Sequence, residues 1–238
     1  MVPHRHGRAL ELNQDYIHGF SGAEQRRLID QADILAPKVF AGGAYSGAGC
    51  LLEIGCGVGA ELKQVARRWP GVQVTGIDLS WPHLQAAASH LKQELAGGTA
   101  ALVRGDALGL PFADCSFDRV ITIWMLEHVP DPSAVLGEAL RVLRDDGLLV
   151  CTEVDNASFR FDPPQPVIAD WWDRFNRLQM QHGDPFVGSR LAKIAASLGA
   201  TGIRVEPVPV ISSRGEPERR LQQLDYLRDL LLSGAETM

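Results

Sequence analysis

The chain has 238 residues, of which 45% are hydrophobic and 22% charged, as expected for one sizeable α/β domain with small additions. A formal net charge of -6 without any Lys/Arg-rich run disfavours DNA or RNA as a partner. No segment approaches the roughly 18 uninterrupted apolar residues that a membrane-spanning helix needs, and the first residues lack the apolar core of a signal peptide. We therefore expect a cytoplasmic protein, monomeric or homodimeric, that binds neither nucleic acid nor membrane.

The first 45 residues are predicted to form a tail followed by a helical cap. Ser21 and Glu24 have the spacing of a capping box, and apolar residues recur at helical spacing as far as Leu35. Pro37 and the glycine-rich residues after it predict the end of this helix. The chain is therefore divided into a tail and cap, residues 1–45, and a main domain, residues 46–238.

From Cys50 onward, short apolar runs alternate with helical segments. Strands are predicted at residues 50–54, 72–79, 101–106, 118–124 and 147–154, and helices at residues 60–69, 82–95 and 132–143. Strands and helices that alternate at this spacing form right-handed crossovers in a parallel sheet. The sequence therefore predicts an α/β fold.

This alternation stops after Asn156. A proline-rich loop is followed by predicted helices at residues 169–181 and 189–200, and residues 201–213 are predicted to supply one or two strands. The last predicted helix is amphipathic, and we expect its apolar stripe to pack on the domain. The stripe consists of Leu221, Leu224, Leu227 and Leu231.

Three glycines, Gly55, Gly57 and Gly59, lie between the first strand and the first helix of the main domain. Glycine allows a tight turn and a close approach to a ligand, and the N–H groups at the start of the helix favour an electron-rich ligand. The spacing alone also fits a simple tight turn. It fits a dinucleotide site equally well, because Ala60 completes that fingerprint.

Three acidic residues narrow the choice of ligand. Asp78 ends the second strand 21 residues after Gly57, where a carboxylate can accept hydrogen bonds from both hydroxyls of a ribose. Glu53 is costly to bury alone; it would pair with the ammonium and sulfonium of S-adenosylmethionine (SAM) but would repel a pyrophosphate. Asp106 ends the third strand and could accept a bond from the adenine amino group, with the Ala107 N–H bonding a ring nitrogen. The acids therefore favour SAM.

Other nucleotide enzymes fit the sequence less well. A short-chain dehydrogenase needs a lysine four residues after a tyrosine, and none of Tyr16, Tyr45 and Tyr226 has one. The Gly-Lys-Ser/Thr phosphate loop of many ATP-binding enzymes is missing as well. The four cysteines contain no CxxC pair, so no metal site is predicted.

Residues 51–62, 76–80 and 105–120 together closely resemble class I SAM-dependent methyltransferases, and the likeness continues over about residues 50–155. The resemblance implies a Rossmann-like, doubly wound, mostly parallel sheet of seven strands, with a helical cap at the N-terminus and an insert before the last strands. It also implies SAM as the cofactor, bound across the carboxyl ends of the strands, and S-adenosylhomocysteine (SAH) as the product. The cofactor residues implied in the main domain are Glu53, Gly55, Gly57, Gly59, Asp78, Leu79, Asp106, Ala107 and Ile123.

Residues 16–32 resemble the capping helix of a family subset that acts on small molecules. In that subset a tyrosine, an arginine and a glutamine face the methionine end of the cofactor; the matching residues here are Tyr16, Arg27 and Gln31. A guanidinium binds a carboxylate through two hydrogen bonds, which suits Arg27 to this task. The alternative is that these are ordinary solvated helix residues.

Substrate contacts are expected from the end of the fourth strand and from an insert at about residues 157–190. Trp124 could stack on a flat substrate or pack against the sheet. His128 could orient or deprotonate an acceptor, and a structural or cofactor-contacting role is the alternative. The other predicted substrate residues lie in the insert and are Trp172, Arg177, Gln181 and His182.

The sequence thus predicts an enzyme that transfers the methyl group of SAM to an N or O atom of a small molecule, as in secondary metabolism. Such in-line displacement depends on placement, which can supply roughly 7–11 kcal/mol. The alternative function is a non-catalytic SAM-fold protein that regulates or assembles with others. A macromolecular acceptor is disfavoured because the chain has no basic flank and no Asn-Pro-Pro-Tyr-type tetrapeptide.

Overall fold

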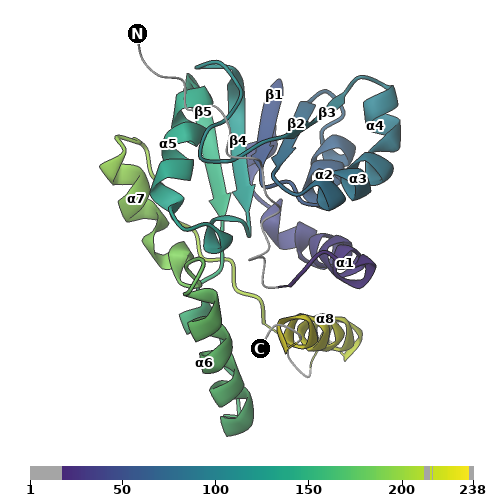
Figure 1. Ribbon diagram of the computed structural model, residues 1–238, viewed down its shortest axis with the longest axis vertical. Helices are drawn as coiled ribbons and strands as arrows, with labels where there is room; N and C mark the ends of the chain where they lie inside the picture. The colour runs from purple at the N-terminus through teal and green to yellow at the C-terminus, as the bar shows by residue number, and fades with distance from the viewer. Residues whose placement is uncertain (1–17, 212–214, 216, 236–238) are drawn as a thin grey trace.

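One parallel sheet of five strands forms the centre of the described part of the chain, which comprises residues 18–211, 215 and 217–235 of a computed structural model (Figure 1). Its order is β3-β2-β1-β4-β5, so the direction of winding reverses between β1 and β4, as in doubly wound folds. The strands are β1 (Cys50–Ile54), β2 (Gln73–Asp78), β3 (Ala100–Arg104), β4 (Phe117–Ile123) and β5 (Leu143–Thr152).

The central strand β1 explains why this part of the sequence is a continuous apolar run. β1 pairs with β2 on one side and β4 on the other, and Leu51, Leu52 and Ile54 are fully buried. Successive side chains of a strand point to opposite faces, so Leu51 and Leu52 enter different hydrophobic cores. Both faces of the sheet are therefore covered, as parallel sheets require.

Helices supply the covering layers. On one face α2 (Ala60–Arg68) and α3 (Trp81–His90) pack through Leu62 and Leu84, and on the other α5 (Pro132–Val142) packs through Leu136 together with α7 (Leu191–Ser197). The single helix predicted at residues 82–95 is divided, since α3 ends before Leu91 and a short α4 (Lys92–Ala96) follows.

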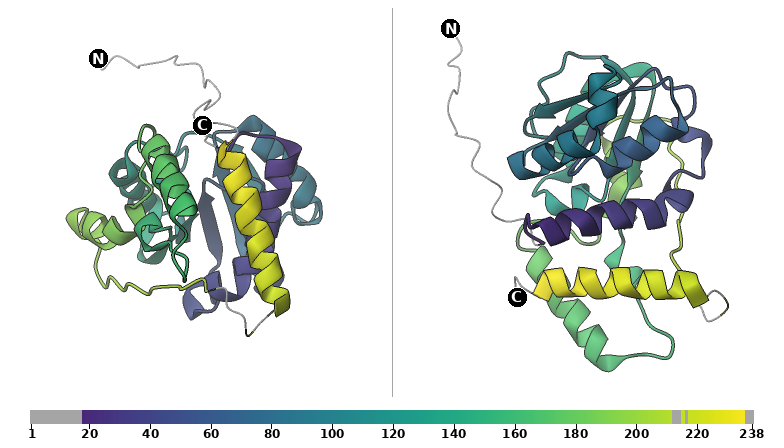
Figure 2. Two further views of the ribbon diagram at one scale, coloured as in Figure 1. Left: turned by 90° about the horizontal axis from the view of Figure 1, so that it is seen from below. Right: turned by 90° about the vertical axis from the view of Figure 1, so that its right-hand side faces the viewer.

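Two long helices lie side by side beneath the carboxyl ends of the strands (Figures 1 and 2). They are α1 (Gly22–Val39) and α8 (Pro217–Ala235). Ser21 is the N-cap residue of α1, as its spacing from Glu24 predicted, because the Ser21 hydroxyl accepts the Glu24 N–H at 3.1 Å. The helix ends at Val39, between Pro37 and the glycine-rich residues that were together predicted to end it, and a proline in the last turn removes only one helical hydrogen bond.

The predicted apolar stripe of α8 is only partly correct. Leu221 is 64% exposed and Leu224 is 37% exposed, whereas Gln223 is buried and Tyr226 and Leu227 are half-buried. The inner face of α8 is therefore shifted from the leucine stripe toward two polar residues. The side chain of Leu231 lies outside the described residues.

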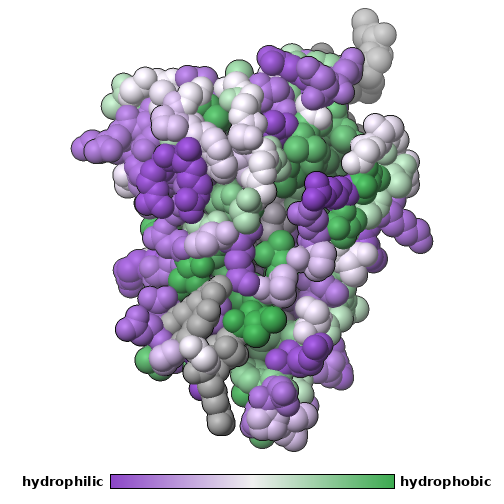
Figure 3. Space-filling model, turned by 180° about the vertical axis from the view of Figure 1, so that it is seen from behind, coloured by the Kyte–Doolittle hydropathy of each residue, from purple (hydrophilic) through white to green (hydrophobic). Residues whose placement is uncertain are grey.

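The segment after α7 differs most from expectation. Within residues 201–211 no strand forms, and Val205 is 70% exposed. Pro207 and Pro209 have no N–H to donate to a neighbouring strand, which explains the lack of pairing here. The described residues thus contain five of the seven expected strands, and the space-filling view shows several separate hydrophobic patches on the back of the molecule (Figure 3).

The remaining helices lie near the carboxyl ends of the strands or join the larger elements. These remaining helices are η1 (Gly43–Tyr45), η2 (Leu126–His128), η3 (Asn156–Ser158), α6 (Pro166–Gln179) and η4 (Val187–Arg190). Among all helices in the described ranges, none is both long and apolar enough to cross a membrane.

Candidate functional site

The turn between β1 and α2 is built on the three predicted glycines. Gly55, Gly57 and Gly59 have φ angles of 74°, 49° and 71°, in the left-handed region that favours glycine. A Cβ atom on Gly55 would lie 2.2 Å from Cγ of Met125, so this turn is pressed against the residue that follows β4. At Gly57 no atom lies within 4 Å of such a Cβ, so the backbone there borders open space.

The end of β2 holds this glycine loop in place. The N–H groups of Gly55 and Cys56 donate to the Ile77 carbonyl at 2.8 and 3.0 Å. The Asp78 carboxylate accepts hydrogen bonds from the Gly57 N–H and the Ser80 N–H, each at 2.8 Å. Because each carboxylate oxygen can accept two hydrogen bonds, Asp78 keeps acceptor capacity for a ligand.

Buried carboxyl groups gather beside the loop. Glu53 is 1% exposed, and its Oε2 has no hydrogen-bond partner among the described residues. Burial, together with the charges of Glu61 and Asp78, raises the pKa of Glu53 well above its usual range, and burial raises the pKa of Glu61 to about 7. A cation placed here would stabilise the ionised form of both glutamates. No cluster able to hold a metal ion occurs among the residues described.

The other predicted cofactor residues lie where β2, β3 and β4 end. The Leu79 carbonyl accepts a hydrogen bond from Arg104 Nε at 3.2 Å. Asp106 is exposed and accepts the Leu108 N–H at 2.9 Å, and Ala107 beside it is half-buried. Ile123 closes β4 and is 6% exposed. The structure thus brings the predicted main-domain residues to one edge of the sheet.

Helix α1 presents a buried polar row toward this edge. Arg27 donates to both carboxylate oxygens of Glu24, at 2.7 and 2.6 Å, and to Gln31 Oε1 at 2.8 Å. All three side chains are buried, so the alternative of solvated helix residues does not apply to Arg27 and Gln31. Tyr16 lies outside the described residues.

The chain leaving β4 has an unusual backbone. Trp124 has a φ angle of 50°, a conformation that non-glycine residues adopt only at a cost and that is frequent at functional sites. Its N–H donates to the Thr152 carbonyl at 2.9 Å, and its ring is packed against the core on the α2 and α3 face. This contact agrees with the packing role predicted for Trp124; the side chain is half-buried, and the stacking role stays a prediction.

His128 and Arg27 belong to a group of six side chains that we call the lid cluster. Gln179 Nε2 donates to Glu127 Oε2 at 2.8 Å, and the rings of His18 and His128 are 6.2 Å apart. Arg27 hydrogen-bonds the Tyr226 hydroxyl, which brings α8 to the cluster. The lid cluster consists of His18, Arg27, Glu127, His128, Gln179 and Tyr226.

Burial dominates the electrostatics of the lid cluster. It lowers the pKa of His128 to about 4, with the charge of Arg27 acting in the same direction. Burial raises the pKa of Glu127 to about 7, although the Gln179 hydrogen bond and Arg27 oppose it. It also raises the pKa of Tyr226 to about 12. A neutral imidazole and a carboxyl group that ionises near neutral pH therefore lie together.

Four members of the lid cluster were not predicted from the sequence, namely His18, Glu127, Gln179 and Tyr226. Glu127 is adjacent to the predicted His128, so a polar pair directly after a strand was a usable signal. Gln179 and Tyr226 lie in helices whose orientation depends on tertiary packing, and His18 precedes the helix start. No pattern in the sequence identifies these three.

The insert supplies an aromatic stack beside the cluster. Trp171 and Phe175 are parallel to within 13° with ring centres 5.3 Å apart, and the Phe175 ring lies 5.9 Å from that of His18. Trp172 stacks on Phe175 with ring centres 5.3 Å apart, and its Nε1 donates to the Asn156 carbonyl at 3.0 Å. The predicted Trp172 is thus part of this stack.

Three other predicted substrate residues lie on the outside of the insert. Arg177 is exposed and forms an ion pair with Asp173 one turn earlier in α6. Gln181 and His182 are exposed in the turn after this helix. These three side chains are exposed, whereas the buried glutamine of this region is Gln179.

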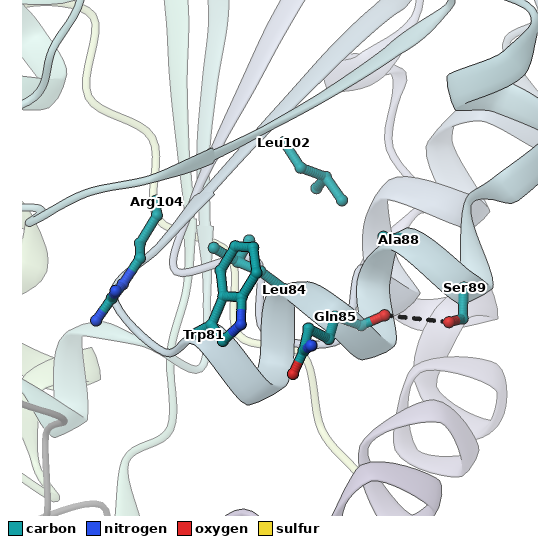
Figure 4. Close-up of a pocket in the computed structure, with 7 residues that line it drawn as sticks. All are labelled: Trp81, Leu84, Gln85, Ala88, Ser89, Leu102 and Arg104. Atoms are coloured by element: carbon teal, nitrogen blue, oxygen red, sulfur yellow. Dashed lines mark hydrogen bonds between the residues drawn. The ribbon is translucent and has the colours of Figure 1, made fainter.

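A separate groove of about 520 Å³ lies at the edge of the sheet, between α3 and β3 (Figure 4). Trp81 and Arg104 border one end of it and Ser89 lies toward the other. None of the predicted site residues lines this groove. Arg104 connects the groove with the site, because its Nε donates to the Leu79 carbonyl.

Comparisons with known proteins match the central part of the chain. A family model described as a methyltransferase domain matches residues 52–151. The demethylmenaquinone methyltransferase of Roseiflexus castenholzii is 36% identical over 131 residues, which are 55% of this chain and 51% of that protein. The norajmaline N-methyltransferase of Rauvolfia serpentina is 39% identical over 92 residues, which are 39% of this chain and 31% of that protein. The chain therefore spans about half the length, or less, of these curated relatives.

A solved structure extends the likeness beyond the matched domain. The phosphoethanolamine N-methyltransferase 2 of Haemonchus contortus, solved in complex with SAM, has a TM-score of 0.63. It is 20% identical, and the likeness covers 89% of this chain and 47% of that chain. At this level of identity the comparison shows a shared fold, which includes helices outside residues 52–151.

Proposed function

Because residues 52–151 form a class I SAM-dependent methyltransferase domain, we propose that the protein transfers the methyl group of SAM to an N or O atom of a small molecule. The glycine loop and its buried acids are the observation that carries this proposal. They combine open space at Gly57, the Asp78 carboxylate beside it, and the buried Glu53 Oε2 that lacks a partner among the described residues.

The residues present fit SAM as the cofactor. Glu53 would face the positive groups of the methionine end, because ionising this buried acid requires a cation nearby. Asp78 would accept hydrogen bonds from the ribose hydroxyls, and Asp106 with Ala107 would bind the adenine edge. A pyrophosphate would add negative charge beside Glu53 and Glu61, so a dinucleotide fits poorly.

Helix α1 has the position of a cap for this site. It lies beneath the carboxyl ends of the strands, and its buried row contains two of the three residues expected near the methionine end. Within this row, Arg27 forms an ion pair with Glu24. We therefore propose that α1 excludes water from the site, with Gln31 and the Arg27–Glu24 pair as its inner surface.

When bound, the cofactor supplies a methyl carbon on a sulfonium; an acceptor lone pair bonds this carbon as the carbon–sulfur bond breaks and leaves its electrons on sulfur. The chain contributes alignment and exclusion of water, which can account for roughly 7–11 kcal/mol of such a barrier. His128, neutral at working pH, is the group of the lid cluster to which we assign the proton lost by the acceptor.

The aromatic stack supports a small and partly apolar acceptor. Trp171, Trp172 and Phe175 line up beside the lid cluster, and small-molecule sites are mostly apolar with few polar groups. The relative from Rauvolfia serpentina is named as an N-methyltransferase acting on a small molecule, norajmaline. The negative net charge adds no argument for a nucleic-acid acceptor.

Transfer of a radioactive methyl group tests the proposal. Purified protein is incubated with methyl-labelled SAM and a panel of phenols, amines and carboxylic acids, and labelled product is extracted and counted. We expect label in at least one acceptor, and loss of labelling when the Asp78→Asn variant replaces the wild type. Production of neither labelled product nor SAH with any member of a broad panel would count against a small-molecule acceptor.

A further inference from the structure

Glu127 is held between α6 and the imidazole of its neighbour in η2. It is 8% exposed, and its Oε2 accepts the hydrogen bond from Gln179. Its Oε1 lies 3.7 Å from His128 Nε2. The two oxygens therefore have different tasks: one is anchored to the insert, and the other faces the ring.

The backbone at Glu127 is anchored separately. The Asp184 N–H donates to the Glu127 carbonyl at 2.9 Å. A Cβ atom on Gly183 would lie 2.0 Å from the same carbonyl oxygen, so the turn after α6 touches η2 at a distance that only glycine permits. The position of Glu127 is thus fixed by the main chain as well as by Gln179.

Charged and titratable groups face Glu127 from every element that packs around it. Helix α1 contributes Arg27, and α8 contributes Tyr226, on which Glu24 of α1 also acts. Glu153 at the end of β5 is another buried carboxyl, with a pKa raised to about 8 by burial and by the charge of Glu127. Within η2 the facing group is His128, whose ring in turn contacts that of His18.

A carboxylate on the Nε2 side has two effects on an imidazole. It favours the tautomer whose proton is on Nε2, which makes Nδ1 the basic nitrogen. It also stabilises the imidazolium that forms when Nδ1 takes up a proton. Burial and Arg27 both disfavour a charged His128. An ionised Glu127, with Oε1 3.7 Å from Nε2, would oppose them.

We propose that Glu127 is a positioning residue for methyl transfer, which orients His128 and stabilises its protonated form when Nδ1 takes the proton of the acceptor. In this step the N–H or O–H bond of the acceptor breaks, its electron pair stays on the acceptor atom, and the proton bonds to Nδ1. The inference rests on the proposed function. It adds a residue of η2 and its anchor on α6, Gln179, to the groups that act at the site.

Nuclear magnetic resonance of histidine-labelled protein saturated with SAH tests this role. In the wild type, the ring signals of His128 should shift with an inflection near pH 7 and report a proton on Nε2. The Glu127→Gln variant should lose the inflection and change the tautomer ratio. The conservative Glu127→Asp variant should keep an inflection, which a purely structural role would not require.

A second variant keeps the carboxyl group and changes only its anchor. Gln179→Met removes the donor that stabilises ionised Glu127, so the inflection should move to higher pH. Glu94→Gln, on the far side of α2 and paired with Lys63, is the matched control and should leave the His128 titration unchanged.

Calorimetry with SAH separates the possible failures. If the wild type binds SAH and the His128 titration is the same in wild type, Glu127→Gln and Gln179→Met, the positioning role is contradicted while the proposed function stands. If the wild type binds no SAH, the proposed function fails and the role of Glu127 in methyl transfer fails with it.

Discussion

The glycine loop and the lid cluster lie at the same edge of the sheet but are assembled differently. The loop is a product of one β1–α2–β2 unit, and its hydrogen bonds join neighbouring strand ends such as Gly57 and Asp78. The lid cluster joins distant segments; Glu127 and Gln179 are 52 residues apart, and α8 adds Tyr226. The loop therefore depends on local backbone geometry, and the cluster depends on how the helices pack.

Their electrostatics differ as well. Beside the loop, the buried Glu53 and the half-buried Glu61 have no nearby cation among the groups that shift their pKa values, so the loop is suited to a positive ligand. In the lid cluster, Arg27 is neutralised by Glu24, and Glu127 is hydrogen-bonded by Gln179. The glycine loop is therefore suited to a positively charged cofactor, and the lid cluster is suited to proton transfer.

The largest effect is expected from breaking the buried ion pair of the lid cluster. Arg27→Met removes the guanidinium that pairs with the buried Glu24 carboxylate, which should lower the free energy of unfolding by about 3–5 kcal/mol. Arg228→Met is the matched control, because its ion pairs with Asp225 and Asp229 are exposed and should contribute less than about 1 kcal/mol. If urea unfolding showed equal losses of unfolding free energy for Arg27→Met and Arg228→Met, the Arg27–Glu24 pair would not be a stabilising buried ion pair.

The glycine loop should be the next most sensitive. Gly55→Ala adds a Cβ that meets Met125 and forces an unfavourable φ, so we expect a loss of about 2–4 kcal/mol. Gly71→Ala is the control, since its Cβ has no neighbour within 4 Å, and its stability should change little. Thermal unfolding of the two variants compares them directly; a Gly55→Ala protein as stable as wild type would show that the loop is not constrained.

The pH dependence of stability distinguishes buried from exposed acids. Burial raises the pKa of Glu153 to about 8 in the folded protein, above its value of 4.5 when exposed. The folded state thus holds this proton more tightly than the unfolded state, and the stability it contributes is complete below pH 4.5 and is lost as the pH rises to about 8. From pH 5 to pH 8 the unfolding free energy of wild type should fall by about 3–4 kcal/mol more than that of Glu153→Gln.

Glu94 supplies the contrast for that measurement. Its hydrogen bonds with Lys63 lower its pKa against the opposing effect of burial, so its contribution is lost only as the solution becomes more acidic. The Glu94→Gln variant should therefore follow the wild type between pH 5 and pH 8. Parallel curves for wild type and Glu153→Gln would show that Glu153 is not buried in the folded protein.

The smallest effects test which face of α8 packs on the domain. Tyr226→Phe removes the hydroxyl that Arg27 hydrogen-bonds and should cost about 1–2 kcal/mol. Leu221→Ala, on the 64% exposed side, should change stability by less than about 0.5 kcal/mol. A larger loss for Leu221→Ala would restore the leucine stripe expected from the sequence.

The contrast between local backbone geometry and the packing of distant helices also explains how much of the fold and of the site could be predicted from the sequence. The order of strands and helices from Cys50 to Thr152 follows from hydrophobic periodicity and turn residues, because βαβ units form from local segments. The residues of the glycine loop could be identified for the same reason. Gly55 must adopt a positive φ wherever the chain turns there, whatever packs around it.

What could not be predicted depends on tertiary contacts. Periodicity indicates that α8 is amphipathic, but the helix turns its Gln223 and Tyr226 inward because α1 presents a polar row to it. In α6, Arg177 and Gln179 are both polar, and only the placement of the insert over η2 decides that Gln179 is buried. The strands expected after α7 fail within residues 201–211, where prolines interrupt the apolar pattern.

Isothermal titration of the protein with SAH measures binding at the glycine loop. We expect one site per chain for the wild type and at least about tenfold weaker binding for Asp78→Asn, because a hydrogen bond to a charged group contributes about 1.5–3 kcal/mol. Asp145→Asn, an exposed carboxylate on β5, should bind as the wild type does. Absence of binding by folded wild-type protein, or equal affinity for the wild type and Asp78→Asn, would contradict the assignment of the cofactor site.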